Sequence, residues 1–400
     1  MCFDYFYLTS ADATLVAAIE DCKANETSDA FTTYINAKFA AGELTTAAEV
    51  YAAHTAWQIA QAKSSGSTDL TKVIRNAAIA DATDWDGATI LSGEKYTGAP
   101  DDNYLDKNTG SIDASQTIYG LPAGKYVLKA ATRSKAGTTG NIYVYSKDQA
   151  DTKTAINADG NTGGTLDLGW SWTEVEFTLT ATSDVKIGFW ANTTNYWASC
   201  DDFHLTLVGE FVTIPNSSYS SLASAYALDF AKATTTTDNA GELTAFAVTN
   251  ITKDAVTLSS IPHIPAATGV ILKGTPGATY TIPVYPTDYT PTTNLLQAAV
   301  TATDIEANAA YILQGGKFHK VTEASTVPAG KAYLLAKDVP TEARSLSFIF
   351  DSEATGINDA TLKNNEESIK DGEFYNLQGQ RVECPTKGLY IVNGTTVIIK

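Results

Sequence analysis

The feature that most constrains the fold is a long region in which apolar and polar residues alternate. Between residues 69 and 209, segments such as "KYVLKAATR", "GNIYVYSK" and "DFHLTLVG" place an apolar side chain at every second position. This period is typical of strands with one face on a core, because successive side chains point to opposite faces of a sheet. Glycine and Asx turns separate the segments. The region therefore predicts a β-sandwich or jelly roll.

Residues 11–62 have a different period and predict helices. Their Ala-rich segments place apolar residues three and four positions apart, as on one face of an α-helix. Ser28 and Thr45 occupy positions typical of N-caps, and Gly42 that of a C-cap. We expect a helical hairpin or small bundle over residues 1–63, which the linker "SSGST" then ends.

Further β regions follow the predicted jelly roll of residues 67–209. Residues 210–351 contain strand-like segments such as "TGVILKG" and "AAYILQGGKFHKV", bounded by prolines and glycines, and predict a second all-β domain. Residues 352–373 are polar and charged and predict a linker. Residues 374–400 predict a small C-terminal β tail, in which Asn393-Gly394 favours a hairpin. The expected fold is mainly β with an N-terminal helical segment.

The charge of the chain disfavours several classes of partner. Its 27 basic and 45 acidic residues give a formal net charge of -18. Such a field repels phosphate backbones and anionic lipids, so we expect no nucleic-acid partner, whereas a neutral polysaccharide carries no such penalty. No segment approaches the ~18 apolar residues of a transmembrane helix, so we expect no membrane insertion. The four cysteines are scattered, which disfavours a disulfide framework and a zinc site.

The start of the chain, "MCFDYFYLTS", lacks the basic region, the apolar region and the cleavage pattern of a signal peptide. Because aromatic residues begin at once, we expect the natural chain to continue upstream of Met1. The alternative is a cytoplasmic protein that is complete as written, which fits the composition less well.

Segments of the predicted jelly roll resemble a known family. They are "TDLTKVIRNAAIADATDWDGATI", "IYGLPAGKYVLKAATRS", "GWSWTEVEFTLTATSDVKIGFWA" and "WASCDDFHLTLVG", in this order. Together they resemble galactose-binding-like jelly rolls, close to the carbohydrate-binding modules of secreted proteins of gut Bacteroidetes. The hairpin motif is common among β-sandwiches, and the order of the segments is the more specific part. The resemblance implies that a polysaccharide or glycan is the partner.

The regions downstream also resemble proteins of these bacteria. "IPAATGVILKG" and "VPAGKAYLLA" are similar to a C-terminal β-domain of Bacteroidetes surface and secreted proteins. The tail "FYNLQGQRVECPTKGLYIVNGTTVIIK" is similar to the C-terminal sorting-type domains of that phylum, and this is the most specific resemblance. It implies that the secretion machinery is a partner and that the protein is secreted or displayed on the cell surface.

Aromatic residues are the strongest candidates for a binding site. A sugar offers an apolar face to a ring, while its hydroxyls bond to Asn, Asp or Arg side chains. Alternation in "GWSWTEVEF" puts both Trp residues on the glutamate face, away from Val175 and Phe177, and so favours a loop or outer-surface place for at least one of them. The alternative is that these rings belong to the core. The expected ligand-binding residues are Trp170, Trp172, Trp190, Tyr196, Trp197 and Arg133.

Asp201 and Asp202 do not suit a catalytic pair. Neighbours on a strand point to opposite faces, whereas a glycosidase needs two carboxylates about 5–9 Å apart across the scissile bond. The family resemblance implies instead that Asp201 ligates a structural calcium ion, with companion ligands near Asp84 or Asp86. The alternative is an Asx turn or a strand cap. "NADGNTGG" echoes a calcium loop but lacks its glycine and closing Glu, so we expect a surface turn there.

Catalytic motifs are missing from the sequence, which contains no GxSxG, HExxH or Walker loop. His204 alternates with Phe203 and Leu205, so we expect it to be solvated on an outer face. We therefore do not expect an enzyme, and a glycoside hydrolase is the weakest hypothesis.

The sequence favours non-catalytic carbohydrate binding by a secreted or surface-displayed multidomain protein. One form of this hypothesis makes the chain the C-terminal part of a larger polysaccharide-processing protein. The alternative is a structural or adhesive surface protein, whose β-domains act as spacers or protein-contact modules.

Overall fold

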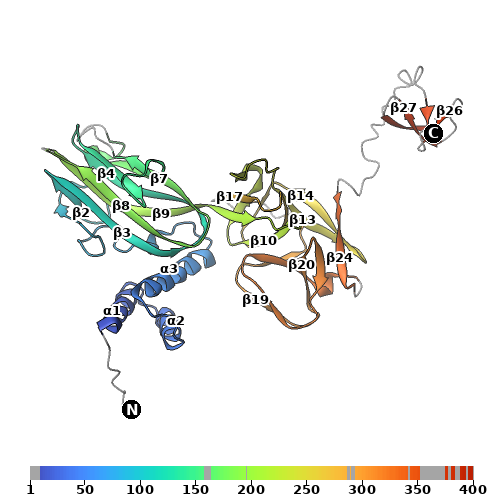
Figure 1. Cartoon of the computed structure of the whole chain (residues 1–400), viewed down its shortest axis with the longest axis horizontal. Coiled ribbons are helices and arrows are strands. Elements are labelled where there is room, and N and C mark those ends of the chain that lie inside the picture. The colour runs from blue at the N-terminus through green and yellow to red at the C-terminus, as the bar shows by residue number, and fades with distance from the viewer. Residues whose placement is uncertain are drawn as a thin grey trace, which may run out of the picture.

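The computed structural model describes residues 10–156, 164–194, 196–285, 289, 293–340, 343–351, 374–376, 380–382, 388–392 and 395–399. Its architecture is mainly β with N-terminal helices, which confirms the expected fold class (Figure 1). No helix within the described ranges is long and apolar enough to span a membrane.

The N-terminal helices pack on one another through buried apolar side chains. They are α1 (Ser10–Asn25), α2 (Asp29–Ala40) and α3 (Ala47–Ser64). Ser28 caps α2 as predicted, because its side chain accepts a hydrogen bond from the backbone N–H of Phe31. The N-cap of α3 is Thr46 and not the predicted Thr45, since Glu49 completes a capping box with Thr46.

The jelly roll is a sandwich of two antiparallel sheets. Its strands are β1 (Ile90–Ser92), β2 (Asn103–Asn108), β3 (Ser111–Leu121), β4 (Gly124–Ser134), β5 (Thr139–Val144), β6 (Lys153–Ala155), β7 (Ser171–Leu179), β8 (Ser183–Asn192) and β9 (Trp197–Thr213). Strands in the order β1-β2-β9-β4-β7 form what we call the front sheet. Strands in the order β3-β8-β5-β6 form the back sheet. Side chains such as Leu128, Phe189 and Leu205 are fully buried between them.

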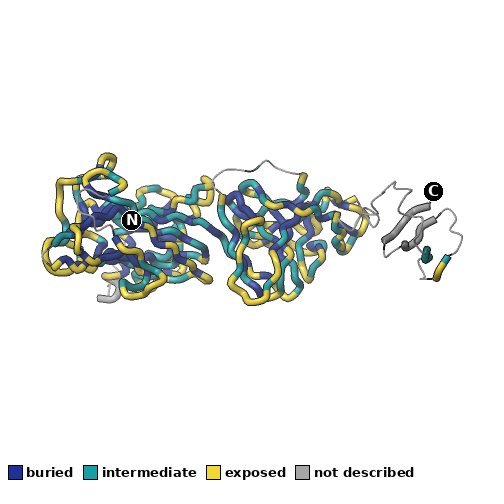
Figure 2. The backbone as a smooth tube through the Cα atoms, turned by 90° about the horizontal axis from the view of Figure 1, so that it is seen from above, coloured by how far each residue is buried: buried dark blue, intermediate teal, exposed yellow. Residues whose placement is uncertain are grey.

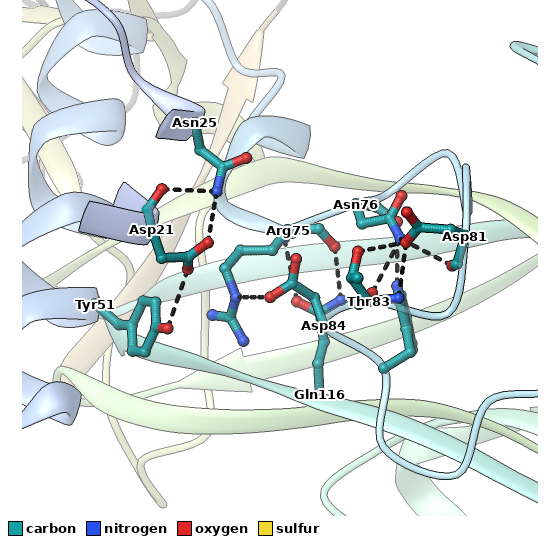
Figure 3. Close-up of polar contacts among 10 residues, drawn as sticks. Asp21, Asn25, Tyr51, Arg75, Asn76, Asp81, Thr83, Asp84 and Gln116 are labelled. Atoms are coloured by element: carbon teal, nitrogen blue, oxygen red, sulfur yellow. Dashed lines mark hydrogen bonds and ion pairs between the residues drawn. The ribbon is translucent and has the colours of Figure 1, made fainter. Parts of the chain in front are cut away.

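The helices lie beside the back sheet, and α3 packs directly on β3. Gly120 of β3 allows this approach, because a Cβ there would lie only 2.9 Å from the Cβ of Ala52. Figure 3 shows polar contacts that hold the segment from Arg75 to Asp84, which lies next to the helices. The Arg75 guanidinium lies 4.4 Å from the ring centre of Tyr51, and its Nε donates to Asp84 over 2.9 Å. The helical layer is thus joined to the jelly roll by packing and by these contacts.

A second β domain follows the jelly roll. Its strands are β10 (Tyr219–Ser224), β11 (Ala227–Asp229), β12 (Thr234–Thr235), β13 (Thr244–Ile251), β14 (Ala255–Ile261), β15 (His263–Ile264), β16 (Thr268–Lys273), β17 (Thr279–Tyr285), β18 (Leu296–Ala299), β19 (Thr303–Ile305), β20 (Ala310–Gln314), β21 (Lys317–Lys320), β22 (Ser325–Val327), β23 (Lys331–Leu335) and β24 (Ser345–Phe350). Its main sheet runs β10-β16-β13-β14-β24-β21-β20-β23-β18, with β14 and β24 parallel.

Both β domains also contain short 3₁₀ helices. They lie at Thr71–Val73, Ala150–Thr152 and Asp167–Gly169 in the jelly roll, and at Phe230–Lys232 and Ala336–Asp338 in the second domain.

One strand belongs to both β domains. β9 begins in the front sheet and continues beyond residue 209, where the sequence suggested a boundary, to pair with β17. The paired positions run from Gly209↔Pro283 to Thr213↔Thr279. A single apolar cluster joins jelly-roll residues to residues of the second domain, and Figure 2 shows buried residues in dark blue in both parts. The junction is therefore a shared sheet and core rather than a loop.

The C-terminal tail contains a small antiparallel sheet. Its strands are β25 (Phe374–Tyr375), β26 (Arg381–Val382), β27 (Gly388–Val392) and β28 (Thr395–Ile399). β27 pairs with β28 in a register that brings Val392 opposite Thr395, as a two-residue hairpin requires. Residues 393 and 394 of the predicted turn, and the predicted linker 352–373, lie outside the described residues.

Candidate functional site

The structure divides the predicted ligand residues between the two sheets. One group gathers around Arg133 at one end of the front sheet. The Arg133 guanidinium lies 4.7 Å from the ring centre of Trp170 and 5.3 Å from that of Trp197. It also donates to the Tyr104 hydroxyl over 3.2 Å and pairs with Glu94 at 3.4 Å. Because Arg133 is only 3% exposed, this group is mainly internal.

Trp170 is fully buried, so the expectation that at least one of the two Trp residues lies outside is met by Trp172 and not by Trp170. The alternation rule assumed that Trp170 lies within a strand, but β7 begins at Ser171 and Leu168 just before it has a left-handed φ of 53°. The indole therefore turns under the β1–β2 loop and donates to the backbone oxygen of Glu94 over 3.0 Å. A ring in this position cannot stack on a sugar.

Trp172 lies where alternation predicts, on the outer face of the front sheet and partly exposed. Its ring centre is 5.5 Å from that of His204 and 5.9 Å from that of Tyr96, both edge to face. The Lys129 ammonium lies 4.2 Å from the same ring. Neighbouring side chains therefore already occupy part of its surface.

Tyr196 and Trp197 are partly exposed at the start of β9. The Lys135 ammonium lies 5.6 Å from the Tyr196 ring centre, and Gly137 of the β4–β5 turn allows this ring to approach. Trp197 is thus the more exposed ring beside Arg133, and Tyr196 lies next to it along the chain.

Trp190 is on the other sheet, separate from the other predicted residues. It lies on β8 in the back sheet, directly between Asp113 of β3 and Asn141 of β5. Its neighbours Ile187 and Phe189 are fully buried, whereas Trp190 is partly exposed on the outer face, as alternation predicts. The indole thus occupies a central strand, with a carboxylate on one side and an amide on the other.

The side chains around Trp190 offer both donors and acceptors. Asn141 is 6% exposed, and its Oδ1 has no hydrogen-bond partner within the described part of the chain. Asp113 is exposed and accepts a hydrogen bond of 2.6 Å from the Tyr143 hydroxyl. The Lys147 ammonium lies 5.4 Å from the Trp190 ring centre. We call these five residues, Asp113, Asn141, Tyr143, Lys147 and Trp190, the Trp190 surface.

The position of Tyr143 depends on a glycine. Its ring lies over Gly188, where a Cβ would come within 2.5 Å of the Tyr143 hydroxyl oxygen and 2.8 Å of the Ala114 carbonyl oxygen. Sequence reasoning missed Asp113, Asn141 and Tyr143. Alternation in "SIDASQ" and "GNIYVY" does place them on one face of each strand, but only the register of β3, β8 and β5 brings them together around Trp190.

Simple alternation predicts that the side chains of Asp201 and Asp202 point to opposite faces of the sheet, and the structure differs from this prediction. Asp202 has a left-handed φ of 52°, and the β4–β9 register shifts opposite this point, as at a β-bulge. Asp201 forms an ion pair with Lys95, and Asp202 accepts a hydrogen bond of 2.7 Å from Tyr96. Both carboxylates therefore hold the β1–β2 loop against the front sheet.

Burial and these contacts shift the pKa values of Asp201, Asp202 and His204. Burial raises the pKa of Asp201 to about 7, although the Lys95 ammonium acts in the opposite direction. His204 forms an ion pair with Asp202 at 3.1 Å, and this carboxylate raises the pKa of the imidazole. Burial acts to raise the pKa of Asp202, but the bonds from His204 and Tyr96 outweigh it and lower that pKa. His204 is on the outer face as expected, but it is paired and not simply solvated.

Calcium at Asp201 remains a prediction. Calcium takes about six to eight oxygen ligands, and one oxygen of Asp201 faces the Lys95 ammonium instead. The suggested companions lie elsewhere, since Asp84 pairs with Arg75 and the backbone of Asp86 pairs with β3 of the back sheet. Within the described ranges, no group of three or more His, Cys, Asp or Glu residues is placed to hold a metal. Most of "NADGNTGG" lies outside those ranges.

Comparisons with known proteins find similarity in structure only. No protein-family profile and no curated protein sequence matches the chain. Similar solved structures include a family 61 carbohydrate-binding module in complex with β-1,4-galactotriose, with 18% identity and a TM-score of 0.28, which covers 34% of this chain and 97% of that one. A family 35 module from Cellvibrio japonicus has 12% identity and a TM-score of 0.23, and covers 30% of this chain and 82% of that one.

An enzyme is also among the similar structures. A family 115 4-O-methyl-α-glucuronidase with specificity for decorated arabinogalactans has 8% identity and a TM-score of 0.25. The match covers 32% of this chain but only 17% of that one. At these low TM-scores the matches are similarities only, and function has to be inferred from the residues themselves.

Proposed function

We propose that the jelly roll binds a neutral oligosaccharide or polysaccharide on the back sheet, at the Trp190 surface. The observation that carries the proposal is the position of Trp190, a partly exposed indole on a central strand between Asp113 and Asn141. Aromatic rings accept the apolar face of a sugar, and flanking carboxylate and amide groups accept and donate hydrogen bonds to its hydroxyls.

Asn141 supports this proposal because one of its polar atoms lacks a partner. Buried polar groups are nearly always hydrogen-bonded, and an unmade bond costs about 1–3 kcal/mol. The Oδ1 atom of Asn141 has no such bond within the described chain, while Nδ2 donates to the backbone oxygen of Lys147 over 3.4 Å. This acceptor lies beside Trp190 but is covered, so a sugar hydroxyl would supply the missing donor once a covering side chain moves.

Lys147 lies near the face on which the sugar would stack, but it is weakly held. Its ammonium pairs with Asp148 at 2.9 Å, and the Asp148 side chain is 80% exposed. Exposed ion pairs of this kind contribute about 1 kcal/mol or less. A ligand can therefore move the Lys147 side chain and use its ammonium as a further donor.

The wider context is part of the same proposal. We propose reversible binding without catalysis, since the Trp190 surface offers Asp113 as its one carboxylate among the five residues that define it. Export to the medium or the cell surface, with the tail recognised by secretion machinery, follows from the resemblance of the tail alone and is proposed on that basis.

The experiment is a glycan array and affinity gel with the full chain and a set of Trp and Tyr variants. Trp190→Ala should weaken binding about tenfold or more, equivalent to at least about 1.4 kcal/mol. Asp113→Asn should weaken it less, because an amide still accepts a hydrogen bond. Tyr285→Ala is the matched control, since this ring is 40% exposed but lies on β17 of the second domain.

The other outcomes are equally informative. If Trp197→Ala abolishes binding and Trp190→Ala does not, the ligand site is the exposed end of the Arg133 group, and the assignment to the back sheet is wrong. If no plant, host or microbial glycan binds the unaltered chain, carbohydrate binding is refuted, and the structural or adhesive alternative takes its place.

A further inference from the structure

A cavity in the second β domain is not explained by the jelly-roll site. It has a volume of about 360 Å³ and lies between β10 and β23 on one side and the β19–β22 pair on the other. Figure 1 shows the segment with β19 looping away from β20, and the cavity lies within this part of the domain. Its volume falls in the range of small-molecule sites, about 300–1,000 Å³.

One side of the cavity is apolar. The lining there includes Ile305, Ile312, Val321 and Val327, which belong to a small cluster separate from the main core of the domain. The cavity is open to solvent on one side, so these apolar side chains are in contact with water. An apolar ligand that covers them would be favoured because it removes apolar surface from water.

The other side carries hydroxyls and one cation. Ser220 and Ser221 of β10 line the cavity beside Lys331 of β23. Among the residues that the structure describes, the Lys331 ammonium makes two long contacts, 3.5 Å to the Ser220 hydroxyl and 3.5 Å to the Ser221 carbonyl oxygen. Although acidic residues outnumber basic ones by 45 to 27 in the chain, no described carboxylate forms an ion pair with Lys331.

We propose that this cavity binds a small molecule with an apolar body and one carboxylate. The apolar body would contact Ile305, Ile312 and Val327, and the carboxylate would pair with Lys331. The carboxylate would also accept from the Ser220 hydroxyl, in place of the Ser221 carbonyl oxygen to which this hydroxyl donates over 3.3 Å. Charge complementarity favours an anion over a neutral ligand, because a charge-assisted bond is about twice as strong as a neutral one. This site is independent of sugar binding on the jelly roll.

The test uses isothermal titration of the full chain with decanoate and with decan-1-ol, which has the same chain length but no charge. Decanoate should bind the unaltered protein about tenfold more tightly than decan-1-ol. Lys331→Met keeps an apolar stem and removes the charge, so it should weaken decanoate about tenfold and leave decan-1-ol unchanged. Lys317→Met, an exposed lysine of β21 outside the cavity lining, is the matched control and should change neither.

A blocking variant keeps the test decisive. Ser325→Trp places a large ring at an exposed lining position and should weaken both ligands. Unchanged decan-1-ol binding in Lys331→Met shows that the cavity persists in that variant. The proposal is overturned if neither ligand binds the unaltered chain, if decanoate binds Lys331→Met as tightly as the unaltered chain, or if Ser325→Trp has no effect.

Discussion

Gly188 supports the ring of Tyr143, and replacing this glycine with alanine tests the geometry of the Trp190 surface. The added Cβ would lie 2.4 Å from the Tyr143 Cζ atom, whereas unstrained contacts between carbon atoms need about 3.5–4.0 Å. The opposite side offers no space, because the carbonyl oxygen of Ala114 is 2.8 Å from the same Cβ and is held in the β3–β8 ladder. The Tyr143 ring must therefore move.

The cost follows from what the moving ring loses. Tyr143 is 1% exposed, and its hydroxyl donates to Asp113 over 2.6 Å. A hydrogen bond to a charged group contributes about 1.5–3 kcal/mol, and overpacking costs about 1–3 kcal/mol. We expect Gly188→Ala to reduce the free energy of unfolding by about 3 kcal/mol, or about 6–12 °C in the melting midpoint of a unit of jelly-roll size.

The assay is differential scanning calorimetry of the full chain, with a double-mutant cycle to isolate the contact. In a Tyr143→Ala background the ring is gone, so Gly188→Ala should cost only about 1 kcal/mol, from the contact with Ala114. Gly241→Ala is the control, since a Cβ there meets only Thr275 at 3.6 Å. A cost below about 1 kcal/mol for Gly188→Ala, or an equal cost in both backgrounds, would refute the placement of Tyr143.

Three further predictions concern the ionic contacts of Asp201 and Asp202 and the N-cap of α3. Lys95→Met should destabilise the fold by about 3–5 kcal/mol at pH 8, because it leaves the fully buried Asp201 carboxylate without its ion pair; Asp201→Asn in the same background should recover part of the loss. The raised pKa of His204 means that its pair with Asp202 stabilises the fold below about pH 6.5 and is lost as the pH rises through the raised value. The melting midpoint of His204→Gln should therefore fall below that of the unaltered chain at pH 5.5 and approach it at pH 8.5. Thr46→Ala removes the N-cap of α3 and should cost about 1 kcal/mol in urea denaturation.

The predictions for Lys95 and His204 each have an outcome that contradicts them, and added calcium tests the assignment of Asp201. A Lys95→Met variant as stable as the unaltered chain at pH 8 would show that the ion pair with Asp201 does not hold the loop. An equal effect of His204→Gln at both pH values would exclude the titrating pair. A rise in melting midpoint with added calcium that a chelator reverses, and that Asp201→Asn removes, would support the calcium assignment; an unchanged midpoint would remove it.

The alternating pattern predicted the strands of the jelly roll because period two depends only on neighbouring residues. It placed Trp172 correctly on an outer face, and the same period accounts for Trp190, which lies opposite the buried Ile187 and Phe189. It failed at Trp170 and at Asp202, where left-handed backbone at Leu168 and at Asp202 itself interrupts the alternation. Such local turns are decided by tertiary contacts and leave no period in the sequence.

The contacts that define the candidate site could not be predicted for a different reason. Asp113 and Asn141 meet Trp190 through the register of three strands, and Lys95 meets Asp201 across 106 positions of the chain. A single sequence specifies which residues face outward, but not which outward-facing residues of distant strands become neighbours. The sequence therefore could not show which of the predicted rings lie together, and the structure distributes them over two sheets.

The shared strand β9 makes the two β domains a single mechanical element. Rotating one domain against the other would require the β9–β17 ladder to break, together with the apolar cluster that crosses the junction. A force applied to the jelly roll would act on these hydrogen bonds at the same time and would be transmitted to the second domain, because β9 runs through both. The β9–β17 pairing and the shared apolar cluster therefore limit the rotation of one domain against the other.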